Sequence, residues 1–377
     1  MKRDPHALLC SFLRDREQLP VTGNALLVKQ GEKELFRCYT GKAQKDTLYR
    51  VYSMTKPVTV TAAMQLFEQG AFNLDEPLSR YIPEYRDLTV WDENTHFPRP
   101  AKAPILIRDL FRMSAGITYG GNDCETARQV SALQNRFSCT YPGESYSTLS
   151  FVRELAGIPL AFEPGAHWRY SLCHDVLGGL IEVLSGQTLG DYMHEHIFSP
   201  LQMKDTFFRC PEEKAHRILP ADAPGFGDEK YQPSARYESG GGGLLSTLDD
   251  YMLFSRALTR GGIGENGQRI LKEETVELMR QDQLTEPMKQ DFNWDYLHGY
   301  SYGLGMRTLL FPGSEGIPGS KGEFGWCGVL GTWVLMDPKE DLTCVYMHQR
   351  FPNLEKYVQL SLRPMVYDLI GKGSAEE

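Results

Sequence analysis

The sequence predicts an α+β fold in which one antiparallel β-sheet is built from both ends of the chain, flanked by N- and C-terminal helices. Strand-like runs joined by short turns occur near the N-terminus and over the last part of the chain, and short turns favour antiparallel pairing. Between them, short helical segments alternate with loops rich in Pro and Gly. We therefore expect a discontinuous sheet domain, residues 1–75 plus 235–377, and an inserted, mostly helical domain, residues 76–234.

The first part of the sheet domain begins with a predicted surface helix at the chain start. A hairpin follows, with strands over residues 24–30 and 34–40 around a glycine. Residues 47–52 form a short run of aromatic and β-branched residues. Residues 58–67 have the apolar spacing of a helix, and Gly70 marks its end.

The later elements follow from the same patterns. A helix is predicted over residues 171–185, ending at a glycine, and an amphipathic helix over residues 249–258. A C-terminal helix spans residues 353–370, with a kink expected at Pro364. The predicted strands of this half are residues 302–310, 331–336 and 343–348.

Composition excludes several classes of protein. The 377 residues carry a net charge of −9 and no Lys/Arg block, so neither nucleic acid nor an anionic membrane is an expected partner. No apolar run approaches the roughly 18–20 residues that span a bilayer. The N-terminal apolar stretch is interrupted at residues 14–16, too early for an export signal. The eight cysteines are scattered without a C-x-x-C pair, so we expect a cytoplasmic protein with reduced thiols.

Ser53 and Lys56 form the first candidate for chemistry. Residues three apart on a helix share a face, and Pro57 places this pair at a helix start, where proline is tolerated. There the Ser53 N–H and the helix dipole can stabilise an oxyanion. Serine needs a base to act as a nucleophile, and a desolvated Lys56 with a lowered pKa can serve. The same spacing also arises by chance, with Ser53 as a cap and Lys56 on the surface.

Ser301 is a rival nucleophile. It stands in Gly-Tyr-Ser-Tyr-Gly, residues 299–303, which matches the G-x-S-x-G nucleophile elbow. That elbow requires a helix directly after the serine, whereas the residues that follow Ser301 are glycine-rich and strand-like. The pattern therefore favours a Gly/Tyr-rich strand.

Two further stretches accompany Ser53 and Lys56 in a fixed order. Residues 163–171 lead into a helix, and residues 325–332 lead into a late strand. Together these motifs resemble the serine β-lactamase and penicillin-binding protein superfamily. The likeness is greatest to its class C β-lactamase-like branch, with the family VIII carboxylesterases and related acyltransferases. The resemblance covers about residues 45–350 and implies the β-lactamase/transpeptidase-like fold.

The resemblance also implies roles for individual residues. Ser53 would be the acyl-accepting nucleophile and Lys56 its proton acceptor. Tyr170 matches the tyrosine of the family's Y-x-N motif, which shares the base role and passes a proton to the leaving group. The oxyanion hole would be the N–H groups of Ser53 and Val329, the latter following the W-x-G counterpart of K-T-G. A covalent acyl-enzyme without metal or cofactor is implied.

The resemblance implies three substrate-binding residues, Leu172, Trp326 and Gly328, and the sequence departs from the β-lactamase pattern at the first two. Leu172 replaces the Asn of Y-x-N and cannot hydrogen-bond an acylamino group. Trp326, which precedes Gly328 by two residues, replaces the Lys of K-T-G, so the cation for a substrate carboxylate is missing and a flat apolar wall takes its place. Both changes favour neutral esters over β-lactams. Lys321 and Arg307 are close enough in sequence to supply the missing charge.

Other patterns favour ordinary structural roles. His194 and His196 are two apart, so they face different sides of a helix, and no H-E-x-x-H metal motif is present. The glycine run at residues 239–243 lacks the P-loop pattern and is typical of a close-packed turn. His174 lies one turn after Tyr170 on a helix face. Aromatic residues that either line an acyl pocket or pack in the core are Trp91, Phe97, Tyr119, Trp168 and Trp294.

The sequence thus predicts a serine hydrolase that cleaves small, uncharged esters through an acyl-enzyme and whose partner is a small-molecule ester or amide. Three alternatives stay open. The same fold can transfer the acyl group to an alcohol, or retain β-lactamase or D-amino-peptidase activity. The third alternative is a non-catalytic binding protein that kept the cleft. The joint presence of Ser53, Lys56 and Tyr170 argues against it.

Overall fold

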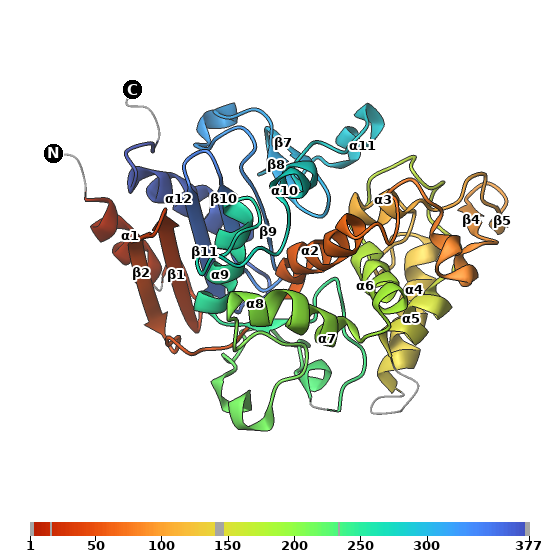
Figure 1. The fold of residues 1–377 in the computed structure, drawn as a ribbon, viewed down its shortest axis with the longest axis horizontal. Helices are drawn as coiled ribbons and strands as arrows, with labels where there is room; N and C mark the ends of the chain where they lie inside the picture. Colours follow the sequence, from red (N-terminus) through yellow and green to blue (C-terminus); the bar gives the residue numbers. More distant parts are fainter. Residues whose placement is uncertain (1–3, 16, 140–146, 233, 374–377) are drawn as a thin grey trace.

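The structure of this protein, a computed structural model, describes residues 4–15, 17–139, 147–232 and 234–373 (Figure 1). Its centre is an antiparallel sheet of seven strands with the order β2-β1-β11-β10-β9-β8-β7. The sheet therefore combines strands from both ends of the chain, which confirms the predicted fold class. Its strands are β1 (Gly23–Gln30), β2 (Lys33–Gly41), β7 (Tyr300–Tyr302), β8 (Arg307–Leu309), β9 (Phe324–Cys327), β10 (Trp333–Asp337) and β11 (Leu342–His348).

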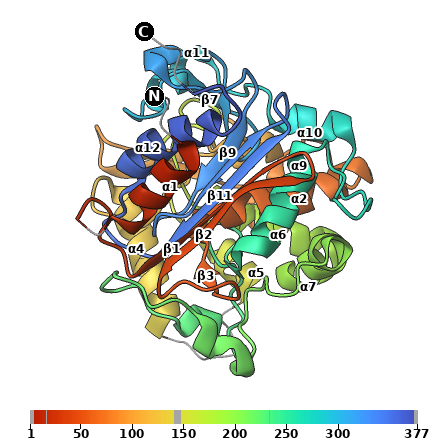
Figure 2. The same ribbon diagram turned by 90° about the vertical axis from the view of Figure 1, so that its left-hand side faces the viewer.

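Both faces of this sheet are covered. Side chains alternate along a strand, so in β11 Cys344 and Tyr346 face one apolar cluster while Val345 and Met347 face another. The helices α1 (Pro5–Arg14) and α12 (Glu355–Asp368) lie side by side over the first face (Figure 2). The helix α9 (Leu248–Thr259) covers the other face, against β1, β10 and β11.

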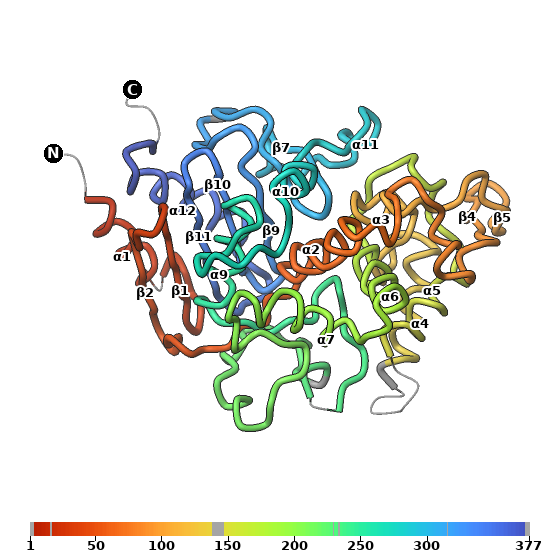
Figure 3. The backbone as a smooth tube through the Cα atoms, in the orientation of Figure 1, coloured from red at the N-terminus to blue at the C-terminus, as the bar shows by residue number. Residues whose placement is uncertain are grey.

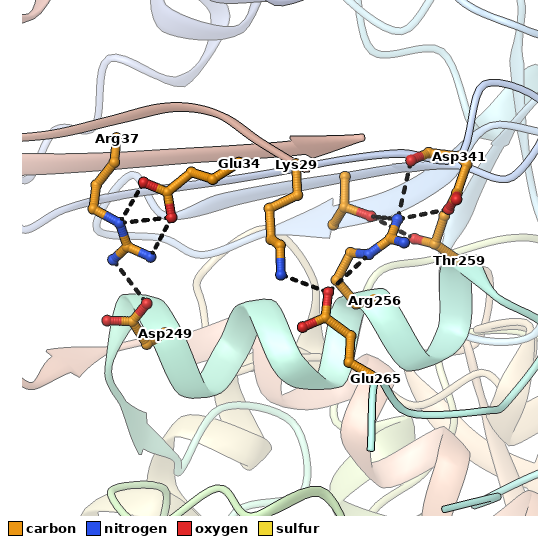
Figure 4. A network of polar contacts seen from close by, with 9 residues as sticks. Lys29, Glu34, Arg37, Asp249, Arg256, Thr259, Glu265 and Asp341 are labelled. Carbon is orange, nitrogen blue, oxygen red and sulfur yellow. Dashed lines mark hydrogen bonds and ion pairs between the residues drawn. The ribbon is translucent and has the colours of Figure 1, made fainter. Parts of the chain in front are cut away.

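A network of ion pairs fastens α9 and the loop after it to the sheet (Figure 4). Arg256 is fully buried on α9 and reaches the turn before β11. Such pairs fix the position of the helix along the strands, because each partner sits on a different element. The pairs are Arg37–Asp249 at 2.7 Å, Lys29–Glu265 at 2.5 Å and Arg256–Asp341 at 2.7 Å.

The segments between the two halves of the sheet are mainly helical. They extend away from it to the β4–β5 hairpin, at the opposite end of the molecule from α1 and α12 (Figures 1 and 3). Besides α9, the α-helices between β2 and β7 in the sequence are α2 (Thr55–Glu68), α3 (Ile107–Phe111), α4 (Glu125–Cys139), α5 (Thr148–Leu155), α6 (Cys173–Ser185), α7 (Leu189–Met193), α8 (Ser199–Leu201), α10 (Glu273–Met279) and α11 (Glu286–Asp291). The small strands are β3 (Tyr49–Arg50), β4 (Thr89–Asp92), β5 (Phe97–Pro100) and β6 (Leu245–Ser246).

The helix α2 lies between the sheet and the helical part (Figure 1). Its residues from Thr55 to Met64 are all buried, and it contacts α6 and α7. A helix that is buried on every side belongs to a core rather than to a surface. The start of α2 is therefore held from several directions. None of the helices within the described ranges has the length and apolar character needed to cross a bilayer.

One predicted element differs in the structure. Residues 302–310 were expected to form a single strand, and they instead form the turn and second strand of the β7–β8 hairpin. Gly305 has a φ of +81°, a conformation that glycine adopts without strain, and the Gly303 N–H donates to the Met306 carbonyl at 2.8 Å. The two glycines thus reverse the chain inside an otherwise strand-like run. The predicted domain boundaries stay a prediction.

The buried ion pair between Glu323 and Arg363 provides a test of this packing. Arg363 on α12 donates to Glu323, which also accepts from the Tyr300 hydroxyl at 2.8 Å. Glu323→Gln leaves a buried guanidinium without its counter-charge, so we expect the free energy of unfolding to fall by about 3–5 kcal/mol. The exposed pair of Glu286 and Lys289 is the control, and Glu286→Gln should cost under about 0.5 kcal/mol. Urea denaturation of both variants checks this, and equal losses would contradict it.

Candidate active site

Ser53 lies in a short 3₁₀ turn, Tyr52–Met54, that runs directly into α2. The residue before it, Tyr52, has a φ of +43°, which is uncommon for a residue other than glycine and costs roughly 1–3 kcal/mol. Two contacts hold the Tyr52 ring: the Lys230 Nζ lies 3.9 Å from its centroid, and Phe226 packs edge-on. A strained and supported turn therefore presents the Ser53 hydroxyl.

Lys56 follows one turn later on the same face of α2 and is fully buried. Its Nζ donates to the Ser53 Oγ at 3.0 Å, to the Tyr119 hydroxyl at 3.0 Å and to the Gly241 carbonyl at 2.6 Å. An ammonium carries three donors, so these three acceptors satisfy it and fix its position. The amine is thus directed at the serine oxygen.

Burial lowers the pKa of Lys56 to about 7, and the carboxylate of Asp175 offsets part of this effect. Asp175 is itself buried on α6, where it accepts from the Tyr237 hydroxyl at 2.7 Å and the Ser239 hydroxyl at 2.5 Å. With a pKa in this range, a large fraction of the Lys56 amine is neutral at neutral pH. A neutral amine can accept a proton, whereas an ammonium cannot.

Tyr170 stands just before α6 and reaches the same serine from the helical part of the fold. Burial raises the pKa of Tyr170 well above its usual range, and hydrogen bonds with Ser53 and Trp326 lower it by less. The Trp326 Nε1 donates to the Tyr170 hydroxyl at 3.0 Å, and the Lys56 Nζ lies 4.6 Å from the Tyr170 ring centroid. The environments of Lys56 and Tyr170 therefore push their pKa values apart, which separates a base from a proton donor.

The β9–β10 turn brings Gly328 and Val329 to the other side of Ser53. A Cβ on Gly328 would lie 2.4 Å from the Val51 carbonyl oxygen, so only glycine allows this approach. The Thr332 hydroxyl donates to the same carbonyl at 3.2 Å, and the Asn353 Nδ2 donates to the Val329 carbonyl at 3.1 Å. These contacts fix the Val329 peptide beside the start of α2.

A cavity of about 400 Å³ opens above Ser53. Rings form much of its wall, and no Lys or Arg side chain of the described residues lines it. Arg307 is fully buried and Lys321 is exposed outside the cavity, so neither supplies the charge that Trp326 displaces. The lining residues are Ser53, Tyr170, Trp294, Asp295, Tyr296, Trp326, Cys327, Gly328, Val329, Asn353 and Glu355.

Other residues that the sequence singled out lie elsewhere. Leu172 is buried in the core at the start of α6 and does not line the cavity, so we assign it no substrate contact. Ser301 lies on β7, and its hydroxyl donates to Asp282 at 2.5 Å. The next element after β7 is the strand β8 rather than a helix. His174 is buried, and burial lowers its pKa to about 3. His194 and His196 lie on a partly exposed helical turn, and no cluster of three potential metal ligands occurs within the described ranges.

Sequence reasoning missed the partners of the central lysine. Tyr119 was grouped with aromatic residues of unassigned role, and no role was predicted for Asp175. Both residues are far from Lys56 in the sequence and approach it only in the folded protein. The glycine run carried a usable signal. A Cβ on Gly240 would lie 2.3 Å from the His174 carbonyl oxygen, so the run passes against α6 and offers its Gly241 carbonyl to Lys56. Lys230 donates to the next carbonyl, that of Gly242, at 3.3 Å.

The antiparallel sheet and the helices packed against it are those of the β-lactamase/transpeptidase fold. The family model for Beta-lactamase matches residues 14–362, and the chain belongs to this family. Protein Rv1367c of Mycobacterium tuberculosis is 33% identical over 82% of this chain and 79% of its own. Esterase EstB of Burkholderia gladioli is 25% identical, covering 93% and 92%. The solved structure of EstCE1, a hydrolase with promiscuous acyltransferase activity, superposes with a TM-score of 0.78 at 22% identity, covering 96% and 98%.

The buried amine makes stability depend on pH. The pKa of Lys56 is about 7 in the folded protein, against 10.5 for an exposed lysine. Between these values the unfolded chain binds a proton that the folded protein does not, so the free energy of unfolding rises with pH, by about 1.4 kcal/mol per pH unit from this group. Lys56→Met loses this contribution. Urea denaturation at pH 6, 7, 8 and 9 should show wild type gaining on the variant above pH 7; a constant difference would contradict the lowered pKa.

Proposed function

We propose that this protein is a serine hydrolase that cleaves uncharged carboxylic esters through an acyl-enzyme. One observation carries the proposal: the Ser53 hydroxyl accepts a hydrogen bond from the Lys56 amine and lines an open cavity together with the Tyr170 phenol. A nucleophile, a base whose pKa lies near neutrality and a proton donor are the groups that acyl transfer requires.

In the first step the neutral Lys56 takes the Ser53 proton as the Oγ attacks the ester carbonyl carbon. The carbonyl oxygen gains the negative charge, and the N–H groups of Ser53 and Val329 would bind it. The Val329 N–H suits this role because it donates to no other group among the residues that the structure describes. The dipole at the start of α2 acts in the same direction.

In the second step the tetrahedral intermediate expels the alkoxide. Tyr170 gives its proton to the leaving oxygen, and the Lys56 ammonium returns a proton to Tyr170. Water then attacks the acyl-enzyme and gives a proton to Lys56, and Lys56 passes that proton to the Ser53 oxygen as the carboxylic acid leaves. Every proton is returned, so the cycle consumes one ester and one water.

The cavity favours an uncharged substrate. Aromatic rings line it, and no Lys or Arg side chain is among its described lining residues. The carboxylate of a β-lactam or peptide would therefore lose its hydration there without gaining an ion-pair partner. An apolar wall also holds an alcohol better than it holds water. Transfer of the acyl group to an alcohol is therefore the second candidate, and added alcohols in the assay below distinguish the two by the ratio of ester to acid formed.

The nucleophile is tested with p-nitrophenyl butyrate. Ser53→Ala should lower kcat at least 1,000-fold, because no covalent intermediate can form. Ser301→Ala is the matched control: this hydroxyl contacts Asp282 rather than the cavity, so its loss should leave kcat within about twofold. A fluorophosphonate probe should label a peptide that contains Ser53. Equal turnover by wild type and Ser53→Ala would refute the proposal.

The base is tested by pH. Because Lys56 must be neutral and its pKa is about 7, kcat/KM should fall tenfold per pH unit below pH 7 and level off above pH 8. Lys56→Arg keeps its charge at every accessible pH and should lose activity throughout. Steady-state rates from pH 5 to 9 measure this, and a flat wild-type profile would exclude Lys56 as the base.

A further inference from the structure

A second cavity, of about 570 Å³, adjoins the one above Ser53 and runs along the first turns of α12. Four residues line both cavities: Asp295, Tyr296, Asn353 and Glu355. The two cavities therefore adjoin each other at these four residues. We call the second one the α12 groove and define it by its remaining lining residues, which are Leu354, Lys356, Tyr357, Leu360 and Ser361.

The groove is apolar where a helix surface would ordinarily be polar. Leu360 is 39% exposed on α12, and Tyr357 is exposed to the same extent. The Tyr357 ring packs against Phe12, and its hydroxyl donates to Gln18 at 2.9 Å, so that side chain is anchored. Leu360 has its exposed surface in the groove, where no described part of the chain covers it.

The polar groups at the junction of the two cavities are already paired. Glu355 accepts from the Tyr296 hydroxyl at 2.5 Å and from the Gln359 amide at 2.9 Å. Asp295 pairs with Lys356 at 2.6 Å. These groups need no charged ligand, and an apolar chain can pass them without leaving a buried charge unpartnered.

We propose that the α12 groove binds the far end of a long apolar chain whose ester carbonyl lies at Ser53. This inference rests on the proposed function and extends the expected substrate from a small ester to one with a medium or long hydrocarbon chain. Leu360 follows Glu355 by five residues, about 7.5 Å along the helix axis. The proposed chain would fill the Ser53 cavity, continue past Glu355 and end against Leu360.

Burial predicts how reactivity depends on chain length. Each methylene removed from water favours binding by about fourfold. For wild type, kcat/KM should therefore keep rising beyond the four-carbon chain. Two series are measured: p-nitrophenyl esters from acetate to decanoate, and alkyl acetates from ethyl to decyl. The series that shows the rise tells whether the chain belongs to the acyl half or to the alcohol half of the ester.

Leu360→Asn tests the groove without touching the groups around Ser53. It should lower kcat/KM about tenfold for ten-carbon chains, mainly through KM, and leave acetate and butyrate unchanged. Phe97→Asn is the matched control. Phe97 is 71% exposed on β5, at the opposite end of the molecule, and its replacement should change no substrate (Figure 1). Equal losses for short and long chains in Leu360→Asn, or no rise beyond four carbons in either series, would overturn the proposal.

A binding measurement separates this proposal from the proposed function. Calorimetry compares methyl decanoate with methyl butyrate on Ser53→Ala, which cannot cleave them, and on Ser53→Ala with Leu360→Asn. Tighter binding of the decanoate that the second substitution removes supports the groove even if no ester is hydrolysed. Equal binding of both esters to both variants overturns the groove even if Ser53-dependent hydrolysis of short esters is found.

Discussion

The contact between the buried Lys56 amine and the Ser53 hydroxyl constrains the rest of this structure. An amine in this position costs free energy in its charged form, and three acceptors and one nearby carboxylate reduce that cost. Each acceptor comes from a different segment, since Tyr119 lies in a loop before α4 and Gly241 in the glycine run. The packing that holds the amine against the Ser53 oxygen is therefore the packing that joins the helical part to α2.

Much of the fold followed from local patterns. The hairpin of β1 and β2, the helices α2, α6 and α9, and strands β10 and β11 all have the apolar spacing of their class. The β7–β8 turn was missed because Gly303 and Gly305 stand in a run that otherwise alternates like one strand. The spacing of apolar residues reflects the average character of a segment, and two glycines that reverse the chain change that average little.

The candidate site divides in the same way. Ser53 and Lys56 are three residues apart, one in the 3₁₀ turn and the other in the first turn of α2. Tyr170 precedes a helix with a clear pattern, so order along the chain was informative. Tyr119 and Asp175 meet Lys56 across long sequence separations, and no spacing encodes such contacts. Leu172 illustrates the converse: its motif position suggested the cavity, but an apolar side chain at the buried start of α6 turns into the core instead.

The strand order has a consequence for how the chain acquires this site during its synthesis. β1 is synthesised early, yet its neighbour on one side is β11, with Ala25 opposite Met347. The Val329 peptide likewise lies far downstream of Ser53. A ribosome must therefore release nearly the whole chain before the sheet closes, and until then the apolar edge of β1 stays without its partner. Truncated products would display that edge and lack the Val329 peptide beside Ser53, so they would be prone to associate.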